Sequence, residues 1–228
     1  MSRVLFLHNF RIAITNPTRQ SLISHPIKPH MTSNSQKPSS MRRQDRALVS
    51  LNPEEEEDVY VLTLKTDPVH QKRMSGLRTR YFPPHLLKVD AHVTLFHALP
   101  ESLKSVITSD LSSLCAKISP FDIRAAKPFR MGRGVGVHVS GLAPVEKLCA
   151  ELQTRWCEHL TLQDSRKFRG HYTLMNKVDD REVIDRCLAE LESDFTGCGG
   201  LATGLDLWRY DRGWWRHERD IEFSGLSV

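Results

Sequence analysis

Long apolar runs are missing from this sequence, and so are the cysteine spacings that mark zinc sites. No stretch of the 228 residues approaches the roughly 20 consecutive apolar residues that a membrane-spanning helix requires. The five cysteines are odd in number and form no Cys-x-x-Cys pair, a pattern typical of reduced thiols. They are Cys115, Cys149, Cys157, Cys187 and Cys198. We therefore expect an intracellular protein without a membrane span, a disulfide framework or a zinc site.

Acidic residues are missing from the start of the chain, because the first of them is Asp45. Seven basic residues precede it, namely Arg3, Arg11, Arg19, Lys28, Lys37, Arg42 and Arg43. Residues 59–228 contain 24 basic and 21 acidic side chains, which leaves a net charge of only +3. The sequence pI of about 9.0 therefore reflects the N-terminal segment and does not indicate a broad nucleic-acid surface.

The first 57 residues differ in composition from the rest of the chain. Residues 15–50 are rich in Ser, Pro, Asn, Gln and Lys, which bury too little apolar area to offset the entropy of ordering. We expect residues 1–57 to be a mostly disordered basic tail, residues 58–224 the folded domain and residues 225–228 a short C-terminal tail. An acid-poor N-terminus with Arg and Ser also fits a mitochondrial presequence. An ordinary tail on a cytoplasmic protein is the interpretation that we favour.

The most informative feature is a short pattern, His-x-Thr-Leu, that occurs twice inside apolar segments. The first copy contains His92 and Thr94, and the second contains His171 and Thr173. Side chains two residues apart point to the same face of a strand, so each histidine should emerge beside its threonine. A hydrophobic core has no reason to repeat a polar pair, because every buried hydroxyl or imidazole needs a partner. The repetition therefore predicts a symmetric active or binding site.

Strand and helix patterns alternate around these two motifs. Strands are predicted at residues 59–64, 91–98, 121–130, 134–140, 201–210 and 215–223, in addition to the second His-x-Thr strand. Helices are predicted to begin near Asp67, Glu101, Pro144 and Asp180. The first helix should have an apolar face of Val69, Met74, Leu77 and Tyr81, and a glycine-rich turn at residues 197–200 should end the last helix. This order predicts a duplicated α+β unit.

Metal binding and nucleophilic catalysis are the main alternatives for a site with two histidines. No carboxylate lies near either motif in strand register, as a further metal ligand would require. His138, His159 and His217 have no repeat partner, and we interpret these three and His97 as structural or surface residues. Strict alternation would place His97 on the strand face opposite His92. No Gly-x-Ser-x-Gly nucleophile elbow is present, and we expect no catalytic metal and no cofactor.

Basic and aromatic side chains provide candidates for further substrate contacts. The cations in the loop before the second motif are Arg166, Lys167 and Arg169. Such a loop suits a phosphate site but also fits an ordinary solvated loop. The aromatic residues near the C-terminus are Trp208, Tyr210 and Trp214, which could stack on a nucleobase or pack in the core. Core packing is the stronger alternative for Trp208. We select Tyr210, Lys167 and Arg169 as substrate-binding candidates.

Three segments of the chain resemble the 2H phosphoesterases, also called the 2'-5' RNA ligase superfamily. They are His92–Pro100, His171–Lys177 and Leu207–Asp211, and the last is similar to the branch with a WRYD-like strand near the C-terminus. The resemblance implies two lobes, each with an antiparallel sheet and outer helices, that face each other across a central cleft. It also implies that the hydroxyls of Thr94 and Thr173 donate to a phosphate.

Histidine can act as an acid or a base near neutral pH, so His92 and His171 could form the pair that opens a phosphodiester. We therefore expect a metal-independent phosphodiesterase that hydrolyses a 2',3'-cyclic phosphate or a 2'-5' linked nucleotide or RNA end, acting as a monomer. The alternative is a non-catalytic nucleotide- or RNA-binding module that uses the same cleft. RNA end joining is suggested only by the superfamily's name. The sequence leaves open which histidine is the acid, and whether the substrate is a mononucleotide, an oligonucleotide, tRNA or an ADP-ribose cyclic phosphate.

Overall fold

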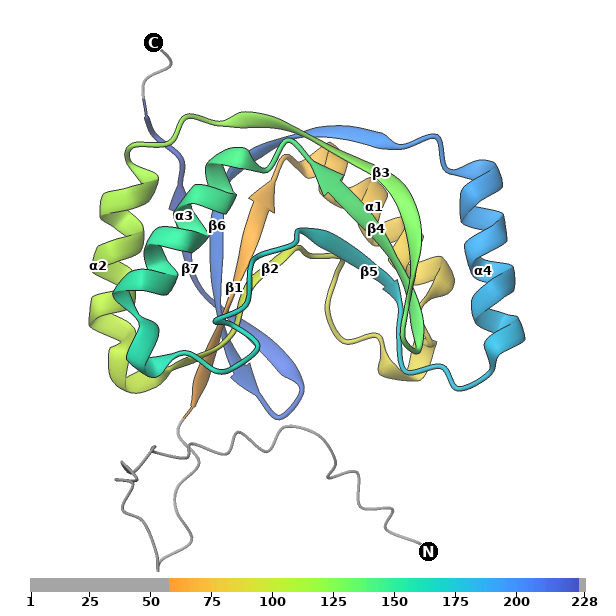
Figure 1. The fold of residues 1–228 in the computed structure, drawn as a ribbon, viewed down its shortest axis with the longest axis horizontal. Coiled ribbons are helices and arrows are strands. Elements are labelled where there is room, and N and C mark those ends of the chain that lie inside the picture. Colours follow the sequence, from red (N-terminus) through yellow and green to blue (C-terminus); the bar gives the residue numbers. More distant parts are fainter. Residues whose placement is uncertain (1–57, 226–228) are drawn as a thin grey trace, which may run out of the picture. The chain divides into compact units, whose positions relative to one another are not determined.

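Seven antiparallel strands form one continuous sheet in the computed structural model, which describes residues 58–225 (Figure 1). The strands are β1 (Val59–Thr66), β2 (Thr94–Pro100), β3 (Phe121–Met131), β4 (Gly134–Ser140), β5 (His171–Met175), β6 (Cys198–Asp211) and β7 (Trp214–Glu222). Their order is β2-β1-β6-β3-β4-β5, and β7 pairs with β6. The expected N-terminal tail and residues 226–228 lie outside the described residues.

The long strand β6 joins the two halves of the domain. Its first residues, from Cys198 to Ala202, pair with β3, whereas the residues from Ala202 to Tyr210 pair with β1. The β7 strand pairs with the second part of β6, from Gly204 onward. The two sheets implied by the resemblance are therefore the two halves of one hydrogen-bonded sheet, with β2 and β5 at its two ends.

Four helices complete the α+β fold and confirm the predicted class. They are α1 (Pro68–Tyr81), α2 (Lys104–Cys115), α3 (Ala143–Arg155) and α4 (Arg181–Asp194), with short 3-10 turns at η1 (Pro84–Leu86), η2 (Glu101–Leu103) and η3 (Cys157–His159). The α1 helix begins where predicted, because the Asp67 carboxylate accepts hydrogen bonds from the backbone N–H groups of Val69 and His70, both at 3.0 Å. No helix within residues 58–225 has both the length and the apolar composition needed to cross a bilayer.

The helices cover the sheet and enclose the core. The α4 helix packs against β3 and β4, and α2 packs against β7 (Figure 1). In the core, the rings of Phe96 and Trp156 meet edge to face at 5.3 Å, and four of the five cysteines are buried free thiols. The α1 helix follows β1 in the chain but packs against β5 and β6. It is thereby placed to contact both His-x-Thr motifs.

The predicted turn at residues 197–200 is wrong, because β6 already begins at Cys198. Within this stretch, Gly197 has a left-handed φ of 94°, whereas Gly199 and Gly200 pair with β3. A Cβ atom at Gly200 would lie 2.4 Å from Cγ of His70 on α1. Glycine at this position therefore lets α1 approach the sheet closely.

The predicted apolar face of α1 is also wrong at Val69, whose surface is 79% exposed. The buried positions of the helix are His70, Met74 and Arg78, which are four residues apart and share one face. Two of these three side chains are polar, and buried polar groups need hydrogen-bond partners. Their partners belong to β6, to the second motif and to the segment that precedes the first motif.

Candidate active site

The first His-x-Thr motif lies at the entrance to β2 and not fully within it as predicted. The strand begins at Thr94, and His92 belongs to the segment before it. That segment is held to β1 by a hydrogen bond from the Leu64 N–H to the Val93 carbonyl at 2.9 Å. Val93 is buried, whereas His92 and Thr94 are half-buried. The two polar side chains therefore share one face, as the spacing predicts.

The second motif repeats this arrangement at the start of β5. His171 and Thr173 are half-buried, and Tyr172 between them is buried in the core. The Thr173 hydroxyl lies 3.8 Å from the sulfur of Met131, which is a weak acceptor. That hydroxyl can therefore turn toward a stronger acceptor such as a phosphate oxygen.

Both imidazoles are held in the same tautomer by the same kind of contact. Nδ1 of His92 lies 2.7 Å from the carbonyl oxygen of Asp90, and Nδ1 of His171 lies 2.9 Å from that of Arg169. In each case the carbonyl belongs to the residue two positions earlier. A carbonyl oxygen can only accept, so Nδ1 must donate its hydrogen and Nε2 is left to exchange a proton with another molecule. The two motifs therefore present two matched Nε2 atoms, one in each half of the sheet.

The surroundings of His92 favour its neutral form. Removal of water from around the ring, followed in size by the charge of Arg78, lowers the pKa of His92 from 6.5 to about 4. His97 and His171 lower this pKa further through their charges. His92 therefore stays neutral to a lower pH than an ordinary histidine, and in that form it can accept a proton.

The polar face of α1 holds both motifs. Gln71 donates to the Ala91 carbonyl at 2.8 Å, directly before His92. His70 bonds the Gly199 carbonyl through Nδ1 at 3.0 Å and the Tyr172 hydroxyl through Nε2 at 3.2 Å. The carbonyl fixes the tautomer, so the Tyr172 hydroxyl donates to His70. Nothing in the sequence pattern marked α1 as the element that joins the motifs.

A β-bulge changes the face of β2 on which His97 lies. Thr94 and Phe96 are two residues apart, yet they pair with neighbouring residues of β1, so β2 contains one extra residue here. The extra residue reverses the alternation of side chains. His97 therefore projects from the same face as Thr94, and the prediction that it lies opposite His92 is wrong.

His97 is oriented by a buried carboxylate from residues 161–170, the loop before β5 that carries Arg166, Lys167 and Arg169 and that we call the cationic loop. Its Nδ1 lies 2.9 Å from Oδ1 of Asp164, which also accepts from the His97 backbone N–H at 2.8 Å. The second oxygen of Asp164 accepts from the Ala98 N–H at 3.0 Å and from the Thr161 hydroxyl at 3.2 Å. Burial alone would raise the pKa of Asp164, but the bonds from His97 and Ala98 outweigh burial and lower it. Asp164 thus fastens the loop to the strand that follows His92.

Replacement of Asp164 by Asn should lower the free energy of unfolding by about 1–3 kcal/mol at neutral pH, because the buried donors lose a charged acceptor. The lowered pKa means that this stabilisation is present above the ordinary carboxyl value of 3.8 and is lost as the pH falls through the folded-state pKa. The difference in Tm between wild type and Asp164→Asn should therefore shrink below pH 3.8. Thermal unfolding across this range tests it, with the exposed Asp194→Asn as the control. A difference that does not change with pH would contradict the assignment.

The β6–β7 hairpin presents an aromatic surface beside His92. The ring of Trp215 lies 4.5 Å from that of His92 and 6.3 Å from that of Trp208, measured between centroids. Trp215 pairs directly with Tyr210 across the two strands, so these side chains share a face of the sheet. The indole N–H of Trp208 donates to the Thr63 hydroxyl at 2.9 Å. We call Trp208, Tyr210 and Trp215 the aromatic surface.

Trp214, which was predicted as a stacking candidate, does not belong to this surface. It is 57% exposed, and its neighbour Trp215 takes the opposite face of β7 by alternation. The Lys88 amine lies 5.3 Å from the Trp214 ring centre. Sequence reasoning missed Trp215 because two adjacent tryptophans give no signal for which of them faces the site.

The predicted cations before the second motif are exposed. Arg166, Lys167 and Arg169 are all on the surface of the loop that leads into β5, and no carboxylate among residues 58–225 lies within ion-pair distance of them. Their charges are therefore not neutralised by the described part of the chain. Arg169 also contributes the carbonyl that orients His171.

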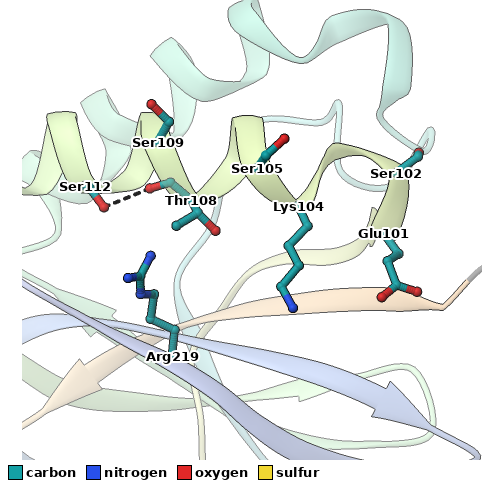
Figure 2. A pocket seen from close by; sticks show the side chains of 8 residues that line it. All are labelled: Glu101, Ser102, Lys104, Ser105, Thr108, Ser109, Ser112 and Arg219. Atoms are coloured by element: carbon teal, nitrogen blue, oxygen red, sulfur yellow. Dashed lines mark hydrogen bonds between the residues drawn. The ribbon is translucent and has the colours of Figure 1, made fainter.

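Two other polar clusters contain no residue of either motif. Figure 2 shows a hollow lined by Glu101, Ser102, Lys104, Ser105, Thr108, Ser109, Ser112 and Arg219, none of which belongs to either motif. Asp206, His217 and Asp220 lie close enough together to hold a cation. Lys65 Nζ already lies 3.0 Å from Asp220, so a lysine supplies the positive charge there. Neither cluster repeats the arrangement of the two motifs, in which a histidine lies beside a threonine in each half of the sheet.

Comparison with known proteins identifies the fold. The model of the family described as the 2'-5' RNA ligase superfamily matches residues 66–214. The crystal structure of TT0787 from Thermus thermophilus is similar to the chain at 14% identity and a TM-score of 0.53, over 74% of this chain and 100% of that one. The crystal structure of E. coli LigT complexed with 3'-AMP has 15% identity and a TM-score of 0.51, over 74% of this chain and 99% of that one. Comparison with curated protein sequences gave no significant match.

Proposed function

The chain belongs to the 2'-5' RNA ligase superfamily, and we propose that it is a phosphodiesterase that hydrolyses a 2',3'-cyclic phosphate or a 2'-5' linked nucleotide or RNA end without a metal ion. The observation that carries the proposal is the matched pair of imidazoles, each with Nδ1 fixed by a carbonyl and Nε2 left for proton transfer. The family match and the fold support a phosphoesterase at a coarse level. The diester substrate and the hydrolytic outcome are our proposal.

In this mechanism His92 is the general base and His171 the general acid. Neutral His92 accepts a proton from water at Nε2, and the water oxygen forms a bond to phosphorus. The bond between phosphorus and the leaving ribose oxygen breaks, and His171 donates its Nε2 proton to that oxygen. A cyclic phosphate thereby becomes a phosphomonoester, and both imidazoles regain their starting states by exchanging protons with water. The lowered pKa of His92 supports its assignment as the base.

The two threonines would bind the non-bridging oxygens of the phosphate. Thr94 and Thr173 each share a face with their histidine, so one hydroxyl approaches the phosphate from each half of the sheet. Hydroxyls placed in this way orient the phosphate and stabilise negative charge as it builds in the transition state.

We further propose that the aromatic surface and the cationic loop bind the rest of the substrate. Trp215 lies beside His92 and Tyr210 shares its face of the sheet, so a nucleobase can stack on this surface. Lys167 and Arg169 offer charges for phosphate groups next to His171. The 3'-AMP complex of the similar E. coli LigT structure supports a nucleotide substrate.

The pH dependence of kcat/KM should be bell-shaped, with an acid limb well below the ordinary histidine value. Because desolvation and the charge of Arg78 lower the pKa of His92 to about 4, the base stays neutral until the pH approaches that value. Initial rates measured from about pH 3.5 to about pH 9 test this expectation. An acid limb centred near pH 6.5 would mean that a residue other than His92 is the general base.

A panel of 2',3'-cyclic nucleotides and 2'-5' linked dinucleotides, incubated with the protein in EDTA, separates this proposal from its main alternative. Turnover of one class in EDTA supports a metal-independent phosphodiesterase. Tight nucleotide binding without turnover would instead favour a binding module that uses the same residues.

A further inference from the structure

Arg78 on α1 bonds both the segment that precedes the first motif and the second motif itself. It exposes only 6% of its surface. Its Nε donates to the Val89 carbonyl at 3.1 Å, and its Nη1 donates to the Thr173 carbonyl at 2.5 Å. The guanidinium also lies over the ring of Phe82, 3.9 Å from the ring centre. One side chain therefore joins the segment that leads to His92 with the strand that carries Thr173.

The charge of Arg78 has no counter-charge in contact with it. Among residues 58–225, no carboxylate lies within ion-pair distance of the guanidinium. Burial lowers the pKa of Arg78 to about 10, and Asp90 opposes this only through a longer-range attraction. A buried cation that is not paired with an anion is unfavourable, so its presence calls for a compensating partner.

We propose that Arg78 is the positioning residue that fixes the two motifs against each other, and that the phosphate of the substrate supplies the negative charge that balances it. This inference deepens the proposed phosphodiesterase function and rests on it. The phosphate need not touch the guanidinium, because a charge acts over several ångströms where water is largely excluded.

Arginine suits this position because its planar guanidinium, a rigid fork of N–H donors, can bond two carbonyl groups at once. Val89 directly precedes Asp90, whose carbonyl fixes the tautomer of His92. The hydrogen bond from Nη1 of Arg78 holds the backbone carbonyl of Thr173, whose hydroxyl is proposed to bind phosphate. Lysine carries the same charge but has a single ammonium in place of the rigid fork, so it cannot reproduce both contacts with the same geometry.

Two variants separate the charge of Arg78 from its geometry. Arg78→Gln removes the charge, and Arg78→Lys keeps the charge but not the fork. The matched control is Arg73→Gln, which makes the same charge change at an exposed position of the same helix. Two of the measurements do not depend on catalytic turnover. They are the pKa of His92, determined by NMR of its imidazole, and the affinity of the protein for inorganic phosphate. The groups that act on His92 in this titration are Arg78, Asp90, His97 and His171, with Trp215 against its ring.

In Arg78→Gln we expect the pKa of His92 to rise by about one unit and phosphate to bind roughly tenfold more weakly, because a nearby cation has been removed. In Arg78→Lys the pKa of His92 should stay near the wild-type value because the charge is kept, while kcat/KM falls by roughly tenfold or more because the motifs are misplaced. Arg73→Gln should match wild type in all three.

A folded Arg78→Gln whose His92 pKa and phosphate affinity equal those of Arg73→Gln would overturn the proposal. If Arg78→Gln does not fold, the Arg78→Lys variant tests the proposal instead. Full wild-type kcat/KM in Arg78→Lys would contradict the positioning role. If the wild-type protein shows no turnover, the proposed function fails, and the His92 titration and the phosphate affinity still decide the role of Arg78.

Discussion

Replacement of either His92 or His171 by alanine is expected to lower kcat/KM by roughly a hundredfold or more, which is the usual range for the loss of a general acid or base. Each imidazole is fixed by its own backbone carbonyl, so neither can take over the role of the other. Both side chains are half-buried at the edge of the core, and their removal should leave the sheet intact. Initial rates with a 2',3'-cyclic nucleotide measure the effect.

His159→Ala is the matched control for the two histidine variants. His159 is exposed at the end of η3, away from both motifs. It should retain wild-type activity, and circular dichroism and thermal melting should show all three variants folded. Near wild-type turnover in both folded His92→Ala and His171→Ala would exclude the paired-histidine mechanism.

Replacement of Thr94 or Thr173 by valine should lower kcat by roughly tenfold or more, but by less than the histidine changes, since each removes one donor to the phosphate. Valine keeps the β-branched shape, so the strands should be little disturbed. The double variant should lose more than either single variant.

The serine variants at the same positions provide the matched control. Thr94→Ser and Thr173→Ser keep the hydroxyl, and they should retain most of the activity. The contrast between serine and valine is measured at saturating substrate, so that it reports kcat and not binding. Equal losses in the serine and valine variants would mean that packing of the methyl group, and not hydrogen bonding, explains the effect.

The order of the helices and strands could be predicted because local patterns determine it. The Asp67–Pro68 pair marks the start of α1, and alternating valines mark β4. The repeated His-x-Thr pattern likewise predicts which side chains share a strand face in each half of the sheet, because side chains two residues apart point the same way.

The other residues around the candidate site could not be predicted, because their positions depend on pairing between distant segments. Arg78 and His70 resemble solvent-facing residues of a helix until α1 is placed against β5. The position of His97 depends on a bulge in the β1–β2 register, and that of Trp215 on its pairing across the hairpin. The glycines of β6 resemble a turn until the close approach of His70 is known.

The most direct test of the central claim is the conversion of a 2',3'-cyclic nucleotide to its monophosphate by the full chain in EDTA, compared with the same chain carrying both His92→Ala and His171→Ala. We expect sustained turnover by the wild-type protein and none above background by the folded double variant. Turnover that requires an added metal ion, or that survives in the double variant, would contradict it.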